Sequence, residues 1–145
     1  MSKQIKHQIK AVTTAMSRTN ELYGYWAKKE GLNYNSLAIL DAINTSEICT
    51  QKKICDEWLI PKQTVNTICK ELLENRYIYF EENSADKRSK IIKLTTDGQN
   101  YVDGLLGGLY QIEEKVMEKM GKEMCEWFVK CTETYYTLFE REVKK

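Results

Sequence analysis

The sequence has few of the residues and motifs that enzymes and metal sites need. Among its 145 residues His7 is the only histidine, and it lies far along the chain from any cysteine cluster, so a mixed zinc site is poorly supplied. There is no glycine-rich phosphate loop, no nucleophile elbow and no histidine placed to activate a serine or cysteine. The acidic residues lie among lysines at helical spacing, which is typical of solvated faces. We therefore expect neither an enzyme nor a bound metal or other cofactor.

Long apolar runs are also missing, and the excess charge is small. No stretch approaches the length of a membrane span, and lysines interrupt the N-terminus where a signal peptide has its apolar core, so a cytoplasmic protein without membrane contact is expected. A net charge of +1 argues against diffuse binding of polyanions. If the chain binds a polyanion, its cations must be clustered in one part of the sequence. Residues 87–93 form such a cluster, with four cations and no acid.

The five cysteines are odd in number and form no Cys-x-x-Cys pair, so a disulfide framework is not expected in a reducing compartment. Cys55, Cys69 and Cys131 fall on apolar stripes, where a cysteine usually serves as a small buried hydrophobe. Cys49 lies beside polar residues at a helix junction. It is the better candidate for a reactive thiol.

The middle of the chain, residues 54–98, predicts two short helices followed by a hairpin. The first helix should end near Leu59. Pro61 suits the start of the second, because its ring fixes φ and it lacks the amide hydrogen that a first helical turn leaves unbonded. The second helix is predicted from about Pro61 to Asn75. The apolar positions expected to be buried are Ile54, Cys55, Trp58 and Ile60 in and after the first helix, and Val65, Ile68, Cys69, Leu72 and Leu73 in the second.

The opposite face of this second helix is polar and consists of Lys62, Gln63, Thr64, Asn66, Thr67 and Lys70. Amides pair with adenine edges, hydroxyls with several base edges, and ammonium groups with phosphates. The face therefore has the chemistry of a recognition helix. Taken alone, these residues also suit an ordinary solvated face.

The hairpin consists of a β-prone run at 77–80, a polar turn at 83–89 and a returning strand at 91–94. A helix pair followed by two strands predicts a winged helix, with Asp86, Lys87, Arg88 and Lys90 at the tip of the wing. Arg88 is expected to enter a minor groove, with Asp86 holding its guanidinium in a fork. The alternative is that the tip is simply a soluble turn.

The residues of the wing resemble the signature of MarR-type transcription regulators. That signature is an Asp-x-Arg wing followed by Leu-Thr-x-x-Gly, and it corresponds here to Asp86 to Arg88 and Leu94 to Gly98. The stretch at 63–66 resembles the start of the family's recognition helix, and the likeness covers nearly the whole chain. Two departures stand out: Arg76 replaces a common glycine, and Phe80 replaces a common arginine that contacts phosphate.

The resemblance implies a homodimer that binds double-stranded DNA as a sequence-specific, ligand-responsive transcription regulator, often a repressor, on a pseudo-palindromic operator. Family ligands are small aromatic or phenolic molecules bound between the dimerisation helices and the DNA-binding unit. The corresponding residues are Tyr23, Trp26, Tyr34 and Tyr101, although these rings equally suit a role in the core. The alternative function is a helical interaction module that uses a winged helix to bind another protein.

The two ends of the chain carry apolar stripes at helical spacing. They predict a helix that ends near Gly31, a second over about 102–120 and a third after Gly121. Asn33 is expected to cap a further helix that buries Leu37, Ile39, Leu40 and Ile43. A small DNA-binding module cannot cover all these stripes, so pairing with another subunit is expected, with an intramolecular bundle as the alternative. The stripes are Ile5, Ile9, Val12, Met16, Thr19, Tyr23 and Trp26; Val102, Leu105, Leu109, Ile112, Val116 and Met120; and Met124, Trp127, Cys131, Tyr135 and Leu138.

The predicted fold class is mainly α with a small β wing, in which a winged helix-turn-helix is flanked by N- and C-terminal dimerisation helices. We expect residues 1–145 to form a single compact unit. Within it, residues 33–95 form the DNA-binding part, and residues 1–31 and 96–145 form the helical dimerisation part.

Overall fold

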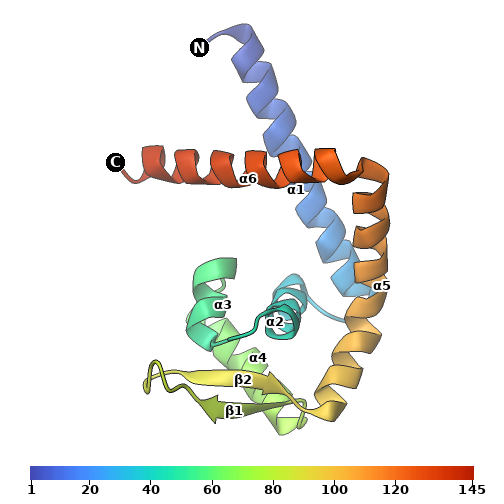
Figure 1. Ribbon diagram of the computed structural model, residues 1–145, viewed down its shortest axis with the longest axis vertical. Helices are drawn as coiled ribbons and strands as arrows, with labels where there is room; N and C mark the ends of the chain where they lie inside the picture. The colour runs from blue at the N-terminus through green and yellow to red at the C-terminus, as the bar shows by residue number, and fades with distance from the viewer. The chain divides into compact units, whose positions relative to one another are not determined.

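The computed structural model describes all residues from 1 to 145 and confirms a mainly helical chain with a small β wing (Figure 1). None of its helices combines the length and the apolar character that crossing a membrane requires. The elements in order are α1 (Lys3–Lys29), α2 (Tyr34–Thr45), α3 (Gln51–Trp58), α4 (Lys62–Glu74), β1 (Ile78–Glu82), β2 (Lys90–Leu94), α5 (Thr96–Met120) and α6 (Lys122–Val143).

The chain divides into two compact units, Met1–Leu106 and Gly107–Lys145, whereas the sequence predicted one. The boundary falls inside α5, so the backbone helix runs from one unit into the other without a linker. Length and composition do not reveal such a division, because no loop or change in composition marks it. The functional division at residues 33 and 95 remains a prediction.

The junction of α1 and α2 follows its sequence signals. Gly31 adopts a positive φ of 75°, which ends α1 near the predicted residue. The Asn33 side-chain oxygen accepts the Ser36 N–H at 2.9 Å and so caps α2. All four predicted core residues of α2, Leu37, Ile39, Leu40 and Ile43, are buried. Helix α2 thus supplies much of the core on which α3, α4 and β2 pack.

The helix-turn-helix formed by α3 and α4 also has the predicted boundaries. The Thr50 hydroxyl accepts the Lys53 N–H at 3.1 Å, which caps α3, and Leu59 ends it with a left-handed φ of 52°. The buried residues are Ile54, Ile60, Val65, Cys69 and Leu72.

Of the residues predicted to be buried in this helix pair, Cys55 and Ile68 are only partly buried, and two others are exposed. Trp58 is 37% exposed and Leu73 is 41% exposed. Both lie in the last turn of their helices. Apolar spacing gives the direction of a side chain, but it does not say whether a neighbouring element reaches that far.

The wing is an antiparallel hairpin in which Ile78 pairs with Leu94, Phe80 with Ile92 and Glu82 with Lys90. Ile78 and Ile92 are buried and attach the hairpin to the core. On the other edge of β2, the Ile92 N–H donates to the Cys49 carbonyl at 2.8 Å. The segment before α3 therefore holds the wing from the side opposite β1.

The wing meets α4 and α5 at a junction that we call the Thr95 junction, made of Arg76, Tyr77, Thr95, Gly98 and Tyr101. The Thr95 N–H donates to the Tyr77 carbonyl at 3.0 Å. The Thr95 hydroxyl donates to the Arg76 carbonyl at 2.7 Å and accepts the Gly98 N–H at 2.9 Å. The Tyr77 and Tyr101 rings stack at 4.2 Å between centroids. One threonine thus joins the end of α4, the hairpin and the start of α5.

Gly98 is the residue of this junction that tolerates no side chain. A Cβ at this position would lie 1.8 Å from the Tyr77 carbonyl oxygen and 2.7 Å from its carbon, and both are backbone atoms that cannot turn aside. The start of α5 therefore approaches the backbone of Tyr77, the residue before β1, more closely than any residue other than glycine allows.

Gly98→Ala is expected to lower the free energy of unfolding by about 1–3 kcal/mol or more, as overpacking does in a closed site. Gly104→Ala is the matched control, because a Cβ there meets nothing within 4 Å and alanine is favoured in a helix interior by about 1 kcal/mol. Thermal and denaturant unfolding of both variants measures the contrast. Equal stabilities would contradict the close approach.

Candidate nucleic-acid interface

The polar face of α4 is open to solvent. Lys62, Gln63 and Asn66 are exposed, and Thr64 is partly covered. Thr67 is exposed, but its hydroxyl donates to the Gln63 carbonyl one turn earlier at 2.9 Å. Its oxygen is therefore left mainly as an acceptor. The exposed donors on this face are the two amides, Lys62 and, nearer the other end of the helix, Lys70.

The N-terminus of α4 adds free backbone donors to this face. Its first intrahelical bond runs from the Val65 N–H to the Pro61 carbonyl, and Pro61 offers no side-chain cap. By contrast, side chains cap α2 and α3. The first-turn N–H groups and the positive end of the helix dipole therefore suit an anionic partner such as a phosphate group.

Lys70 differs from Lys62. Its ammonium lies 3.9 Å from the Glu74 carboxylate, and both side chains are well exposed. Such a pair is weak in water and leaves the lysine able to move. Even so, the nearby carboxylate makes Lys70 a weaker contact for phosphate than Lys62.

The turn of the wing is ordered by bonds between its own side chains and backbone. The Asn83 oxygen accepts the Ala85 N–H at 3.1 Å, and the Asn83 amide donates to the Ser89 hydroxyl at 3.0 Å. The Asp86 carbonyl accepts the Ser89 N–H at 3.0 Å. Asn83 and Ser89 were not among the predicted site residues, although an asparagine that opens a polar turn is a recognised signal for this geometry.

Asp86 does not hold the Arg88 guanidinium as predicted. Its carboxylate accepts the Arg88 backbone N–H at 3.0 Å, in the two-residue pattern typical of an aspartate in a turn. The backbone amide of Arg88 lies within reach of the short Asp86 side chain, whereas the Arg88 guanidinium is exposed to water. Asp86 therefore shapes the backbone and leaves the arginine side chain unconstrained.

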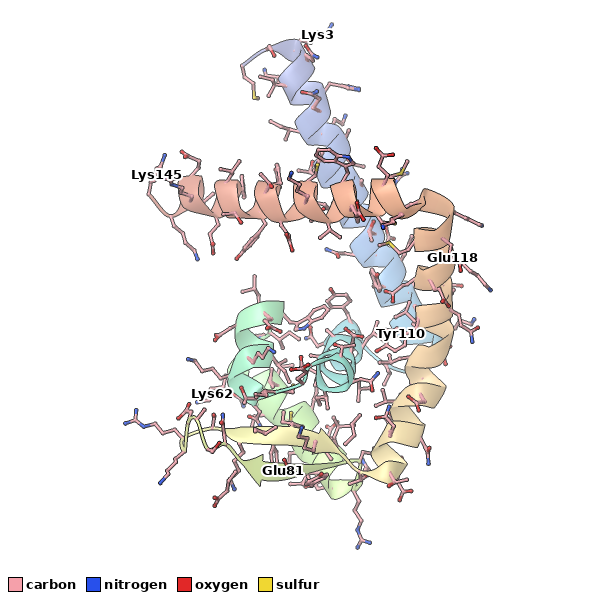
Figure 2. All side chains as sticks on the ribbon, viewed as in Figure 1. Lys3, Lys62, Glu81, Tyr110, Glu118 and Lys145 are labelled. Carbon is pink, nitrogen blue, oxygen red and sulfur yellow. The ribbon has the colours of Figure 1, made fainter.

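Lys87, Arg88 and Lys90 extend from this turn and are exposed. Figure 2 shows the long nitrogen-tipped side chains of the hairpin tip, and Lys62 on the same side of the winged helix. Lys93 belongs elsewhere, because its ammonium donates to the Glu47 carbonyl at 3.4 Å. The tip of the wing and the start of α4 thus present cations and amides toward one side of the same unit.

Comparison with known proteins agrees with this arrangement. Residues 30–89 match the sequence model of the MarR family. A MarR family regulator from Neisseria meningitidis has a similar structure, with a TM-score of 0.82, 26% identity, and coverage of 94% of this chain and 96% of that one. The winged helix of this chain is of the MarR type.

Other solved structures share the fold at lower identity. The MarR protein of Staphylococcus aureus, in complex with salicylate and kanamycin, has a TM-score of 0.69 and 20% identity, over 97% of this chain and 95% of that one. Reduced AbfR bound to DNA has a TM-score of 0.68 and 17% identity, over 96% and 99%. No curated protein matches the chain in sequence.

The two departures from the MarR signature have structural counterparts. Arg76 adopts φ 60°, so this position has the left-handed conformation for which a glycine is suited, although an arginine occupies it. Phe80 is partly buried and pairs with Ile92 in the hairpin. Its ring contributes to the wing's packing where the family commonly has a cation.

The four aromatic residues predicted to line a ligand site have different surroundings. Tyr101 stacks on Tyr77 in the Thr95 junction. Trp26 has a buried ring N–H without a hydrogen-bond partner, and the Lys29 ammonium lies 5.2 Å from its ring centroid. Tyr34 begins α2 and is 38% exposed, and Tyr23 is partly buried. A ligand site formed by these four residues remains a prediction.

Two expectations about the cysteines are wrong. Cys49 is only 1% exposed, and burial raises the pKa of its thiol to about 11, so it is not a reactive thiol. Cys131, predicted to be buried, is exposed on α6, while Cys69 is buried as expected and burial raises its pKa to about 12. Polar sequence neighbours misled the prediction for Cys49, because its backbone lies beside β2 and its side chain points into the core.

Thiol labelling should follow this burial. At pH 8 a pKa near 11 leaves roughly one Cys49 thiolate in a thousand, so Cys49 and Cys69 should be modified only as fast as the protein unfolds, while Cys131 reacts at once. Mass spectrometry of peptides after timed labelling measures the order. Rapid labelling of Cys49 in the folded protein would contradict its burial.

Proposed function

We propose that the chain is a sequence-specific DNA-binding transcription regulator that acts as a homodimer on a pseudo-palindromic operator, most simply as a ligand-responsive repressor. The observation that carries the proposal is the pairing, within one unit, of an uncapped α4 N-terminus bearing Lys62, Gln63 and Asn66 with a cationic, pre-ordered wing tip. A helix with exposed amides suits base edges in a major groove, and extended cations suit an adjoining minor groove. The relative AbfR, solved bound to DNA, supports this role.

A second copy of the chain is the partner that the terminal helices favour. Both α1 and α6 have large apolar side chains exposed along their length. Helix α1 carries six lysines and arginines against one glutamate, whereas α6 carries five glutamates against three cations. Opposite charges beside apolar surface favour pairing between copies over open exposure to water. The exposed apolar residues include Ile5, Ile9, Val12 and Met16 on α1 and Trp127, Phe128, Leu138 and Phe139 on α6.

The symmetry of the proposed dimer determines the symmetry and the spacing of the operator half-sites. Two recognition helices related by a two-fold axis read two half-sites, whose centres lie about one helical turn, or roughly 10 base pairs, apart. The wings then contact the flanks. We place the proposed regulator in the cytoplasm, together with the DNA that it would bind.

Selection from random duplexes, followed by footprinting upstream of its own gene, tests the proposal. The selected site should contain an inverted repeat, and its affinity should fall steeply with salt, since each neutralised phosphate releases counterions. Sedimentation should give a dimer in the absence of DNA. Capture of proteins without any salt-dependent duplex binding would favour the interaction-module alternative.

Arg88→Ala is expected to weaken operator binding by about 1–3 kcal/mol without changing the melting temperature, because the exposed guanidinium contacts DNA and not the fold. Lys115→Ala, which removes an exposed cation on α5, is the control and should bind normally. Asp86→Ala should show a smaller defect, because it loosens the turn that presents Arg88. Titration of a labelled operator at several salt concentrations measures all three variants.

Replacing Gln63 and Asn66 together should change which bases are preferred, because these amides lie near the start of α4, the part of a recognition helix that reaches base edges. Lys62→Ala should instead lower affinity for all duplexes alike and reduce the salt dependence. Selection with each variant separates the two effects. An unchanged preferred site after both amides are altered shows that other residues read the bases.

We further propose that a small aromatic or phenolic ligand binds near Tyr23, Trp26, Tyr34 and Tyr101 and releases the DNA. The relative solved with salicylate supports this class of ligand. Helix α5 contains Gly104, Gly107 and Gly108, and the boundary between the two compact units falls at Gly107. Each glycine weakens a helix interior by about 1 kcal/mol relative to alanine, so α5 can bend there.

Gly107→Ala together with Gly108→Ala is expected to mute the response to ligand while preserving DNA binding. The stiffer helix should resist a change in spacing between the two DNA-reading parts. Titration of salicylate and other phenolic compounds into the protein–operator complex measures release. If the double variant releases DNA as fully as the original protein, bending at these glycines is not the switch.

A further inference from the structure

Leu59 combines two unfavourable features in one residue. It is 84% exposed, and it adopts a left-handed backbone conformation with φ 52° and ψ 34°. It is one of two residues other than glycine with positive φ, and the other is Arg76. The two residues flank the recognition helix α4, with Leu59 three positions before its first residue, Lys62.

The fold requires a left-handed residue at this position, but it does not require that residue to be a leucine. A left-handed residue is needed to end α3, and glycine or asparagine adopts that conformation at lower cost than leucine. The neighbouring Ile60 is buried and makes the apolar contact with the core, so the Leu59 side chain adds little to packing. A strained backbone position that carries an exposed apolar side chain is a feature from which function can be inferred.

The position of Leu59 in the chain limits what its side chain can reach. Three residues span at most about 10 Å, so Leu59 lies within that distance of Lys62. The major groove is about 12 Å wide, which keeps Leu59 within reach of any groove that α4 enters by its N-terminus. The apolar group displayed by base pairs in that groove is the C5-methyl of thymine.

We infer that Leu59 is a specificity-determining residue that packs against the methyl group of a thymine at one edge of each half-site. This inference rests on the proposed DNA-binding function. The Leu59 side chain lies in the turn before α4 and not on α4 itself. It therefore adds an apolar contact beside Gln63 and Asn66, the polar residues proposed to contact base edges. Specificity for thymine then comes from loss of water around two apolar groups.

The test compares duplexes that differ by one methyl group. The starting duplex is the site selected by the original protein, and each thymine is replaced in turn by deoxyuridine, which lacks only the C5-methyl. The proteins are the full-length chain, Leu59→Gly, Leu59→Asn and the control Leu73→Ala. Glycine and asparagine both accept the left-handed conformation, so these variants keep the turn. Leu73 is an exposed leucine at the opposite end of α4.

One deoxyuridine position in each half-site should lower the affinity of the original protein by about three- to tenfold, the range expected for one or two buried apolar carbons. Leu59→Gly and Leu59→Asn should bind the thymine duplex with an affinity lower by a similar factor. Their affinity should not change when deoxyuridine replaces that thymine. Leu73→Ala should keep the original sensitivity. Melting temperatures of the Leu59 variants should be equal to that of the original protein or higher.

Any one of three results would overturn the inference. The affinity of the original protein would be unchanged by deoxyuridine at every position, the Leu59 variants would be as sensitive to deoxyuridine as the original protein, or they would bind the thymine duplex with undiminished affinity. Failure of the proposed function looks different, because the original protein then selects no duplex at all. That result removes the inference as well.

Discussion

The hydroxyl of Thr95 is the interaction on which the winged helix depends. It donates to a carbonyl at the end of α4 and accepts an amide from the first turn of α5, while its own N–H bonds to the residue before β1. The left-handed Arg76 turns the chain toward this point, and Gly98 lets α5 approach the Tyr77 backbone. The relative direction of α4, the hairpin and the start of α5 is therefore fixed by a few short bonds, with the core beneath them.

This rigidity has a functional meaning. A recognition helix and a wing contact one duplex together only if the distance between them is constant. The junction fixes one end of the hairpin, and the Cys49 carbonyl holds β2 through Ile92. At the far end, the Asn83 and Asp86 side chains order the turn without engaging the Arg88 guanidinium. The backbone of the wing is thus fixed at both ends of the hairpin, whereas its long cationic side chains can change conformation.

Much of this could be read from the sequence, because local signals specify local structure. Pro61, Asn33 and Gly31 marked helix boundaries correctly, and the α2 core residues followed from their spacing. Contacts with distant parts of the chain could not be read in this way. The Cys49 carbonyl accepts from β2 and its side chain is buried, and the Tyr101 ring stacks on Tyr77, so neither environment is encoded by sequence neighbours. The prediction for Cys49 was wrong for this reason. Asp86 has two partners in reach, and the nearer amide competes successfully with the guanidinium.

The two edges of the hairpin differ, because the outer edge of β2 bonds to the Cys49 carbonyl through Ile92, whereas the outer edge of β1 pairs with no other strand. The last two residues of β1 are Glu81 and Glu82. Exposed strand edges are sites at which chains add to one another and aggregate, and charged residues discourage this. Two negative charges on this edge discourage its pairing with the same edge of another molecule. If two copies bind one operator as proposed, this repulsion lets their wings stay extended and solvated at a high local concentration.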